Sequence, residues 1–224
     1  YNLFPKPNFS SKDLSILRNE IDIASVQNFK IFIGFKNFFK INQIKTHDLI
    51  LDRTDFNIKK DDLSFFINLM KIEPNKNKLI IKKSNLFFRD NNDEVLFINQ
   101  IKKSSFYFDL QSLKNVFTSK NRIFNIPYKL TIRNDKLNKS LEFKIDSGKL
   151  VIKIANETDY RKKDKKGTLK VTFKNKNNLF NYDIGENSLN FKLEDSNKIF
   201  DGLIEFKPFY LESDLSYQVL KLKD

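Results

Sequence analysis

The sequence has no cysteine and no tryptophan, and only one histidine, five glycines and five prolines in 224 residues. Without cysteine the chain forms neither a disulfide nor a thiolate metal site. With His47 as its one histidine it cannot build a paired-histidine metal site or a histidine relay. Because glycine and proline are scarce, the turns must use asparagine and aspartate, whose side chains bond to the nearby backbone.

Motifs of catalysis are also missing. The sequence contains no Gly-x-Ser-x-Gly, no P-loop and no Gly-x-Gly-x-x-Gly. Its acidic residues are scattered in predicted turns and on the polar sides of predicted strands, and no candidate nucleophile stands beside a base. We therefore expect no enzymatic activity, no metal site and no cofactor.

No apolar run approaches the roughly 20 residues of a membrane span, and no signal peptide is visible. The chain begins at Tyr1 and still alternates between apolar and polar residues from Tyr217 to Lys223. We expect it to be a segment of a longer protein, with any membrane anchor outside the segment.

The net charge of +13 comes from 41 basic and 28 acidic residues. Only six of the basic residues are arginine, the residue that grips phosphate bidentately, so the composition disfavours nucleic acid as a partner. Biased use of Lys, Asn, Ile and Phe explains the charge more simply. The densest basic cluster, Tyr160–Lys166, is either a contact for anionic headgroups or a solvated hairpin tip, and tips normally collect exposed charge.

What the sequence has in abundance is alternation of apolar and polar residues. It is clearest in Leu141–Ile145, Leu169–Lys174 and Leu189–Glu194. Side chains of a strand alternate between faces, so these segments predict a sheet with one apolar face. About ten such strands, joined by hairpins of even spacing, predict an antiparallel meander with a long polar tip over Asn156–Gly167.

One helix is predicted, over residues 61–72. Asp61 or Asp62 can cap it, Leu63, Phe66, Ile67 and Met70 form its apolar stripe, and Pro74 ends it. No sharp domain boundary is visible, so we expect a single domain over residues 1–224, with a possible internal boundary near residues 73–78.

About ten strands with three inward apolar residues each place roughly thirty such side chains on one face. A helix of about eleven residues is only about 16 Å long and cannot cover them. The sheet either closes as a sandwich or barrel, or curls into an open groove that binds an apolar ligand. Alternation alone leaves both open. The residues that we expect on this face, where they would contact the apolar ligand of an open groove, are Phe106, Phe108, Leu130, Ile132, Leu141, Phe143, Ile145, Ile152, Ile154, Leu169, Val171, Phe173, Leu189, Phe191 and Leu193. Phe143, Phe173 and Phe191 therefore lie away from the polar face, where nucleic-acid bases would need to stack.

Several segments carry a family resemblance: Phe4–Phe9 with its two prolines, the strand Ile31–Phe39 with paired bulky residues, Ile44–Arg53, Leu79–Asp90 and Gly202–Phe209. In these the chain resembles the N-terminal region of AsmA-like proteins, relatives of TamB and YhdP. The resemblance covers most of the chain, although glycine is scarcer than in many members.

The resemblance implies a mainly β fold: an extended, antiparallel, curled sheet, shaped as a groove or taco, with one short helix. It also implies a periplasmic, inner-membrane-anchored protein of the cell envelope. Such a protein binds phospholipid and carries its acyl chains between the inner and outer membranes, in outer-membrane biogenesis. The resemblance implies no reaction and no cofactor. We expect no nucleic acid as a partner, and the sequence identifies no protein partner. The alternative is a closed β-sandwich that acts as a structural or adhesion module.

Overall fold

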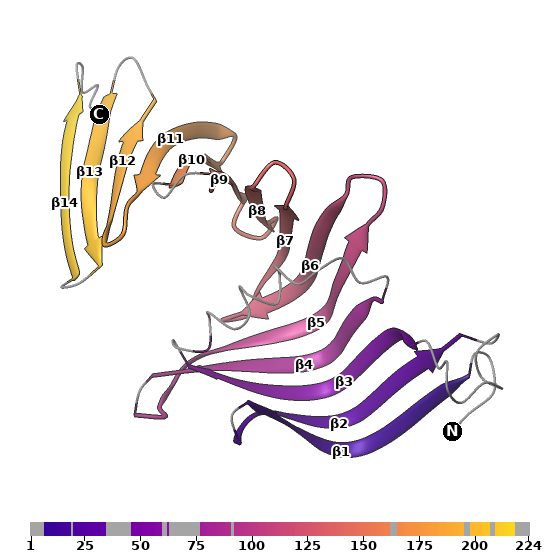
Figure 1. The fold of residues 1–224 in the computed structure, drawn as a ribbon. Helices are drawn as coiled ribbons and strands as arrows, with labels where there is room; N and C mark the ends of the chain where they lie inside the picture. The colour runs from indigo at the N-terminus through magenta and orange to yellow at the C-terminus, as the bar shows by residue number, and fades with distance from the viewer. Residues whose placement is uncertain are drawn as a thin grey trace. The chain divides into compact units, whose positions relative to one another are not determined.

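The computed structural model describes residues 7–18, 20–34, 46–59, 62, 77–90, 92–161, 165–194, 198–206 and 209–217. Nearly all of these residues are in strands. Fourteen strands follow one another in chain order within one sheet (Figure 1). The sheet is open, because β1 and β14 each have only one neighbour. The predicted fold class, a mainly β, open and largely antiparallel sheet, is confirmed, and the closed barrel is excluded.

The strands have the following bounds: β1 Asn8–Arg18, β2 Ile21–Ile33, β3 Thr46–Lys59, β4 Leu79–Arg89, β5 Val95–Asp109, β6 Lys114–Ile123, β7 Ile126–Asp135, β8 Ser140–Ser147, β9 Ile152–Asp159, β10 Lys165–Phe173, β11 Lys176–Ile184, β12 Ser188–Leu193, β13 Lys198–Phe206 and β14 Phe209–Tyr217.

One strand pair departs from the predicted meander. β3 and β4 are parallel, with Leu49 beside Leu79 and Lys59 beside Arg89. Parallel neighbours need a crossover of a dozen or more residues, which residues 60–78 supply. The helix predicted over residues 61–72 falls in this connection and, apart from Asp62, lies outside the described residues. The Asp62 carboxylate accepts hydrogen bonds from the backbone N–H of Lys59 at 2.8 Å and from Arg18 at 2.6 Å.

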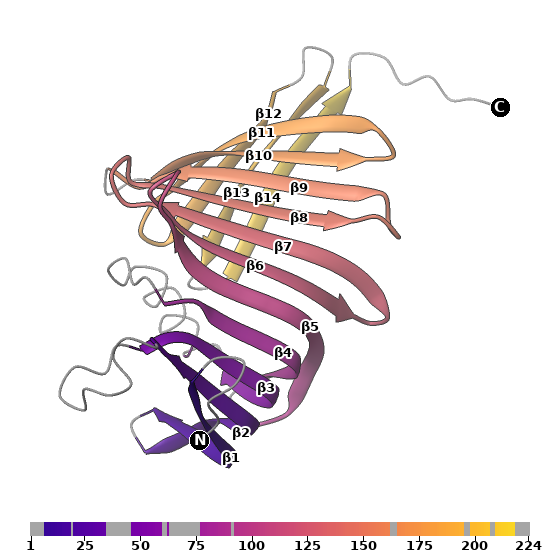
Figure 2. The ribbon, with the colours of Figure 1, turned by 90° about the vertical axis from the view of Figure 1, so that its right-hand side faces the viewer.

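The chain divides into two compact units, Tyr1–Thr131 and Ile132–Asp224, which we describe separately. The division falls inside β7. The single domain and the possible boundary near residues 73–78 stay predictions. In Figure 2 strands β8 to β11 of the second unit run side by side in chain order.

Asparagine and aspartate support several turns, as the composition predicts, although Gly148 lies in the β8–β9 turn and Gly185 in the β11–β12 turn. In the β4–β5 turn Asp90 Oδ1 accepts the backbone N–H groups of Asn92 at 2.8 Å and Glu94 at 2.9 Å. The two-residue turns Phe124–Asn125 and Lys174–Asn175 use positive φ at both positions, as tight hairpins require. No described glycine has a positive φ. The positive φ values therefore occur at non-glycine residues, which disfavour this conformation.

The long polar tip predicted over Asn156–Gly167 is wrong, because β9 continues to Asp159 and β10 begins at Lys165. Polar side chains hold these extensions in the sheet. Tyr182 on β11 bonds to Asn156 and Thr158, each at 2.6 Å.

The Phe124–Asn125 turn gives a test of this turn chemistry. Phe124 has φ 47° and is 75% exposed. A left-handed residue costs about 1–2 kcal/mol, and the entropy of glycine costs about 0.5–1 kcal/mol. Phe124→Gly should therefore raise the free energy of unfolding by about 0.5–1 kcal/mol in urea titrations. Lys129→Gly, inside β7, should lower it. Equal losses from both substitutions would contradict the left-handed turn.

Candidate functional site

Apolar side chains of the first unit line up across neighbouring strands. Phe9 pairs with Ile31, Ile31 with Leu49, Leu49 with Leu79, and Leu79 with Phe106. Phe106 in turn pairs with Phe117 on β6. Residues that are directly paired point to the same side of a sheet. The predicted site residue Phe106 thus lies in a row that crosses six strands, and Phe108 follows it on the same side of β5.

The alternation breaks once in several of these strands, always at the same level of the sheet. In β3 the buried Leu51 and Thr54 are separated by two residues, Asp52 and Arg53. In β4 Lys82–Lys83 precedes the buried Ser84, and in β5 Lys102–Lys103 precedes the buried Ser104. We call this line of two-residue breaks the crease. Skipping one residue restores the apolar side chains to the same face beyond the break.

The backbone at the crease adopts an unusual conformation. Asp13, Arg53 and Lys83 have φ values of 53°, 55° and 50°, a left-handed conformation that non-glycine residues rarely adopt. In β5 the register with β6 shifts between Ile101 and Lys103, as at a β-bulge. Such irregularities bend strands, and strands β1 to β5 are visibly bent along their length in Figure 1.

Side chains replace the ladder hydrogen bonds that the crease interrupts. Between β3 and β4 the register pairs skip from Asp52 and Lys82 to Asp55 and Asn85. In the gap the Ser84 hydroxyl accepts the backbone N–H of Thr54 at 3.0 Å and donates to the Lys82 carbonyl at 2.7 Å. Thr54, Ser84 and Ser104 are almost fully buried. Small residues fit this position because the inside of a bend has little room.

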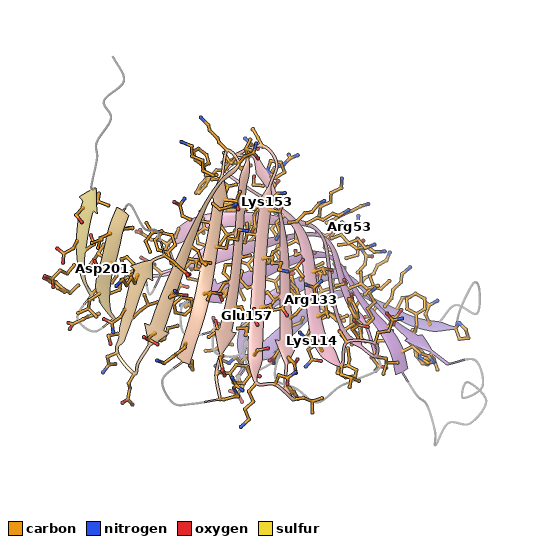
Figure 3. All side chains as sticks on the ribbon, turned by 90° about the horizontal axis from the view of Figure 1, so that it is seen from above. Arg53, Lys114, Arg133, Lys153, Glu157 and Asp201 are labelled. Carbon is orange, nitrogen blue, oxygen red and sulfur yellow. The ribbon has the colours of Figure 1, made fainter. Side chains whose placement is uncertain are left out.

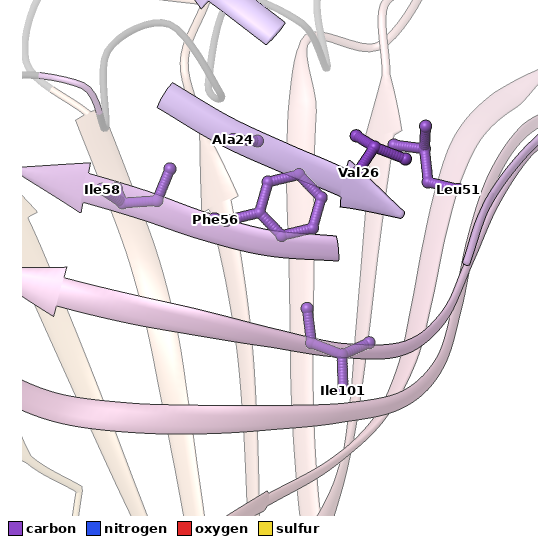
Figure 4. Packing of buried hydrophobic residues seen from close by; sticks show 6 residues of the cluster. All are labelled: Ala24, Val26, Leu51, Phe56, Ile58 and Ile101. Atoms are coloured by element: carbon purple, nitrogen blue, oxygen red, sulfur yellow. The ribbon is translucent and has the colours of Figure 1, made fainter. Parts of the chain in front are cut away.

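Apolar residues from both sides of the crease pack into one cluster. Its buried members are Ala24, Val26, Leu51, Phe56, Ile58 and Ile101 (Figure 4). Leu51 precedes the crease in β3, whereas Phe56 and Ile58 follow it. The two arms of the bent sheet therefore meet on their apolar side, which is the inside of the bend. We call this side the inner face of the first unit.

The inner face of the second unit is defined by rows of direct pairs. Phe143 pairs with Asn156, Asn156 with Leu169, Leu169 with Phe180, and Phe180 with Leu193. A parallel row joins Ile145, Ile154 and Val171. Neighbouring rows hold the other predicted residues of β8 to β12, so one face carries Leu141, Phe143, Ile145, Ile152, Ile154, Leu169, Val171, Phe173, Leu189, Phe191 and Leu193.

Strand β7 carries the remaining two predicted residues. Leu130 and Ile132 alternate on the same side of the strand as Tyr128 and Asn134. In the first unit the Tyr128 hydroxyl donates to Asn99 at 3.0 Å, and in the second the Tyr160 hydroxyl donates to Asn134 at 2.7 Å. Burial raises the pKa of both tyrosines, so their phenols are neutral donors at physiological pH.

The two inner faces differ in how well they are covered. Nine of the ten buried hydrophobic residues in the described chain belong to Tyr1–Thr131, and Leu193 alone belongs to the second unit. Most of the predicted residues of the second unit are half-buried, and Phe173 is 46% exposed. Neighbouring strands shield these side chains, but no layer of the described second unit lies on them.

Two aromatic side chains on the inner face of the second unit lie close over glycines. Gly202 is the register partner of Phe191, and a Cβ at Gly202 would stand 2.7 Å from Phe191 Cζ. Gly167 is the partner of Tyr182, whose hydroxyl would contact a Cβ there. Phe191 also meets Phe200 edge to face at 5.4 Å and Phe180 at 6.5 Å. Glycine at these positions leaves room for the two rings, because a Cβ there would clash with them.

The outer face of the second unit is polar and its charges are mixed. Arg133 on β7 pairs with Glu142 on β8 at 3.7 Å, and Lys166 on β10 pairs with Asp183 on β11 at 3.4 Å. Figure 3 labels further outer-face residues, among them Lys153 and Glu157 on β9 and Asp201 on β13. The second unit is thus a sheet with one polar face and one apolar face.

Sequence reasoning missed the inner face of the first unit beyond Phe106, Phe108 and Leu130. It omitted the crease cluster and, in the second unit, Phe180, Phe200 and Ile204. A signal for the crease exists in the sequence: Asp52-Arg53-Thr54, Lys82-Lys83-Ser84 and Lys102-Lys103-Ser104 repeat two charged residues followed by a small hydroxyl residue. Each triplet interrupts the alternation of a segment. A prediction from strict alternation would therefore end the strand at the triplet.

The chain matches no protein-family model and no curated protein. The resemblance to AsmA-like proteins stays a prediction. Within the described ranges no helix has the length and hydrophobicity that crossing a membrane requires. In the same residues no three His, Asp or Glu side chains come together as a metal site needs. His47 is exposed at the start of β3.

Substitutions at Lys83 test the crease. Glycine should relieve the left-handed strain and raise the free energy of unfolding by about 0.5–1 kcal/mol. Valine, which is β-branched and disfavoured at positive φ, should lower it by more than about 1 kcal/mol. Lys129→Val, on the exposed side of β7, is the control and should change stability by less than about 0.5 kcal/mol. Urea titrations measure all three, and a neutral Lys83→Val would rule out the left-handed residue.

Proposed function

We propose that this chain binds lipid acyl chains along the inner face of its second unit. The proposal is carried by the exposure of apolar side chains in the second unit. Rows of apolar side chains cross this part of the sheet, and Leu193 is the one buried hydrophobic residue among the residues described there. Contiguous apolar surface of this kind is rare on monomeric proteins unless it meets a ligand, a membrane or another protein. The absence of an obvious catalytic constellation in the sequence favours a binding role.

The dimensions and chemistry of the face suit an acyl chain. The seven strands β8 to β14 stand about 4.8 Å apart, so their rows extend about 29 Å. One bilayer leaflet has a hydrocarbon layer of about 15 Å, so an extended acyl chain fits along such a row. Each buried methylene contributes about 0.8 kcal/mol, so the affinity for an acyl chain grows with the length of chain that the face covers.

The aromatic lining over Gly167 and Gly202 supports the same ligand class. Rings packed close over glycine offer apolar surface with few directional contacts. A flexible hydrocarbon chain needs surface of this kind and gains nothing from hydrogen bonds. The polar groups of the face are largely bonded to one another, as Tyr182 is to Asn156 and Thr158.

As the wider role we propose a segment of a periplasmic, inner-membrane-anchored protein that carries phospholipid between the inner and outer membranes. The open sheet and the resemblance of the sequence to AsmA-like proteins support this role. In it the inner face holds the acyl chains and the headgroup stays in water at the edge of the sheet.

Two neighbouring positions on β10 test acyl-chain binding. Val171 points to the inner face and Thr172 to the outer face, where its register partner is Lys153. Val171→Glu places a carboxylate against the ligand and should weaken binding of a fluorescent fatty acid at least tenfold, since about 1.4 kcal/mol of lost apolar contact suffices. Thr172→Glu adds the same charge one residue away and should bind as the parent does.

Fold integrity is checked on the same samples. Val171 is half-buried, so the carboxylate of Val171→Glu can reach water and the strand signal in circular dichroism should persist. Mass spectrometry of an organic extract should find phospholipid with the parent and less with Val171→Glu. Equal fatty-acid binding by both folded variants would refute the proposed face. A parent protein that binds no lipid at all would refute the function.

A further inference from the structure

The outer face of the first unit carries a concentrated positive charge at the crease. Lys82 on β4 pairs directly with Lys103 on β5, and Lys103 pairs directly with Lys120 on β6. Lys83, Lys102 and Arg122 adjoin this row. We call the group the basic ridge: Lys82, Lys83, Lys102, Lys103, Lys120 and Arg122. Five of the six are exposed, and Lys82 is half-buried.

This arrangement opposes folding. Like charges directly opposite each other in a sheet are destabilising, and here two such pairs share one lysine. No ridge residue forms an ion pair with a residue in the described ranges. Asp52, the register partner of Lys82 on β3, is paired with Arg53 at 3.5 Å. The second unit behaves differently, because its outer-face charges form cross-strand pairs of opposite sign.

We infer that the basic ridge docks the chain on the surface of an anionic phospholipid bilayer. Uncompensated lysines on a sheet face match a layer of phosphate headgroups, which supplies many negative charges without fixed geometry. Basic residues near such a surface each contribute to binding. The ridge lies on the side away from the crease cluster, so docking leaves the inner face free.

Nucleic acid is a poorer match for the ridge. Five of its six cations are lysine, which acts as a point charge, whereas arginine grips phosphate in a bidentate manner. The register partners within the ridge are lysines, with no aromatic ring to stack on a base. The ridge also differs from the hairpin tip after β9, where the Arg161 guanidinium is bound by the Asp159 carboxylate.

The test compares two triple variants of equal charge. One replaces Lys82, Lys103 and Lys120 by glutamine, and the other replaces Lys153, Lys170 and Lys192 of the second unit's outer face by glutamine. Flotation with phosphatidylglycerol–phosphatidylcholine vesicles measures binding. Each neutralised ridge lysine should weaken binding about fivefold, and the three together about a hundredfold. The second-unit triple should bind within a few-fold of the parent.

Three further measurements decide the inference. Binding should vanish on pure phosphatidylcholine and fall as salt shortens the Debye length from about 10 Å at 0.1 M to about 3 Å at 1 M. The ridge triple should melt no lower than the parent, because it loses only repulsion. It should also take up fluorescent fatty acid normally, which separates this inference from the proposed function. Equal losses in both triples, or tighter ridge-dependent binding to a mixed-sequence oligonucleotide than to vesicles, would overturn the membrane assignment.

Discussion

The structure depends on cross-strand register, which keeps the apolar side chains of successive strands on one side of the sheet. A slip of one residue in any strand would turn its apolar side chains to water. The second unit meets this requirement by plain alternation through β8 to β12. The first unit meets it despite a bend, because the crease skips one residue in adjacent strands at the same level. Val26 and Phe29, which lie on opposite sides of the bend in β2, can therefore contact one cluster. Register thus explains the core of the first unit and the open face of the second.

The bend accounts for the difference between the units. Where strands fold toward their apolar side, Leu51 and Phe56 of a single strand belong to one cluster and become buried. Where the described strands lack such a crease, the same kind of residue, such as Val171, stays half-exposed. The hydrophobic effect favours covering that surface, at about 25 cal/mol for each Å² removed from water. An acyl chain is a suitable cover because it is flexible enough to follow a surface of rings and branched side chains.

Alternation was enough to predict the class of fold and the inner face of β8 to β12. Phe143, Leu169 and Phe191 share a face because each stands at the matching phase of its strand, and hairpins with short turns preserve that phase. Alternation could not predict the parallel pairing of β3 and β4, which depends on a crossover. It also could not reveal the crease, because two charged residues in succession look like the end of a strand. Alternation also could not show which basic residues lie together. Lys103 belongs to a cluster of positive charge because the register places Lys82 and Lys120 opposite it.

The central claim is that lipid lies on the inner face of the sheet, and site-specific photocrosslinking tests it most directly. A photoactivatable phenylalanine analogue at Leu169 faces the inner side, and the same analogue at Lys170 faces the outer side of the same strand. After irradiation of protein loaded with phospholipid, mass spectrometry should find the lipid adduct at position 169 and not at position 170. Adducts of equal yield at both positions, or at position 170 alone, would contradict the account.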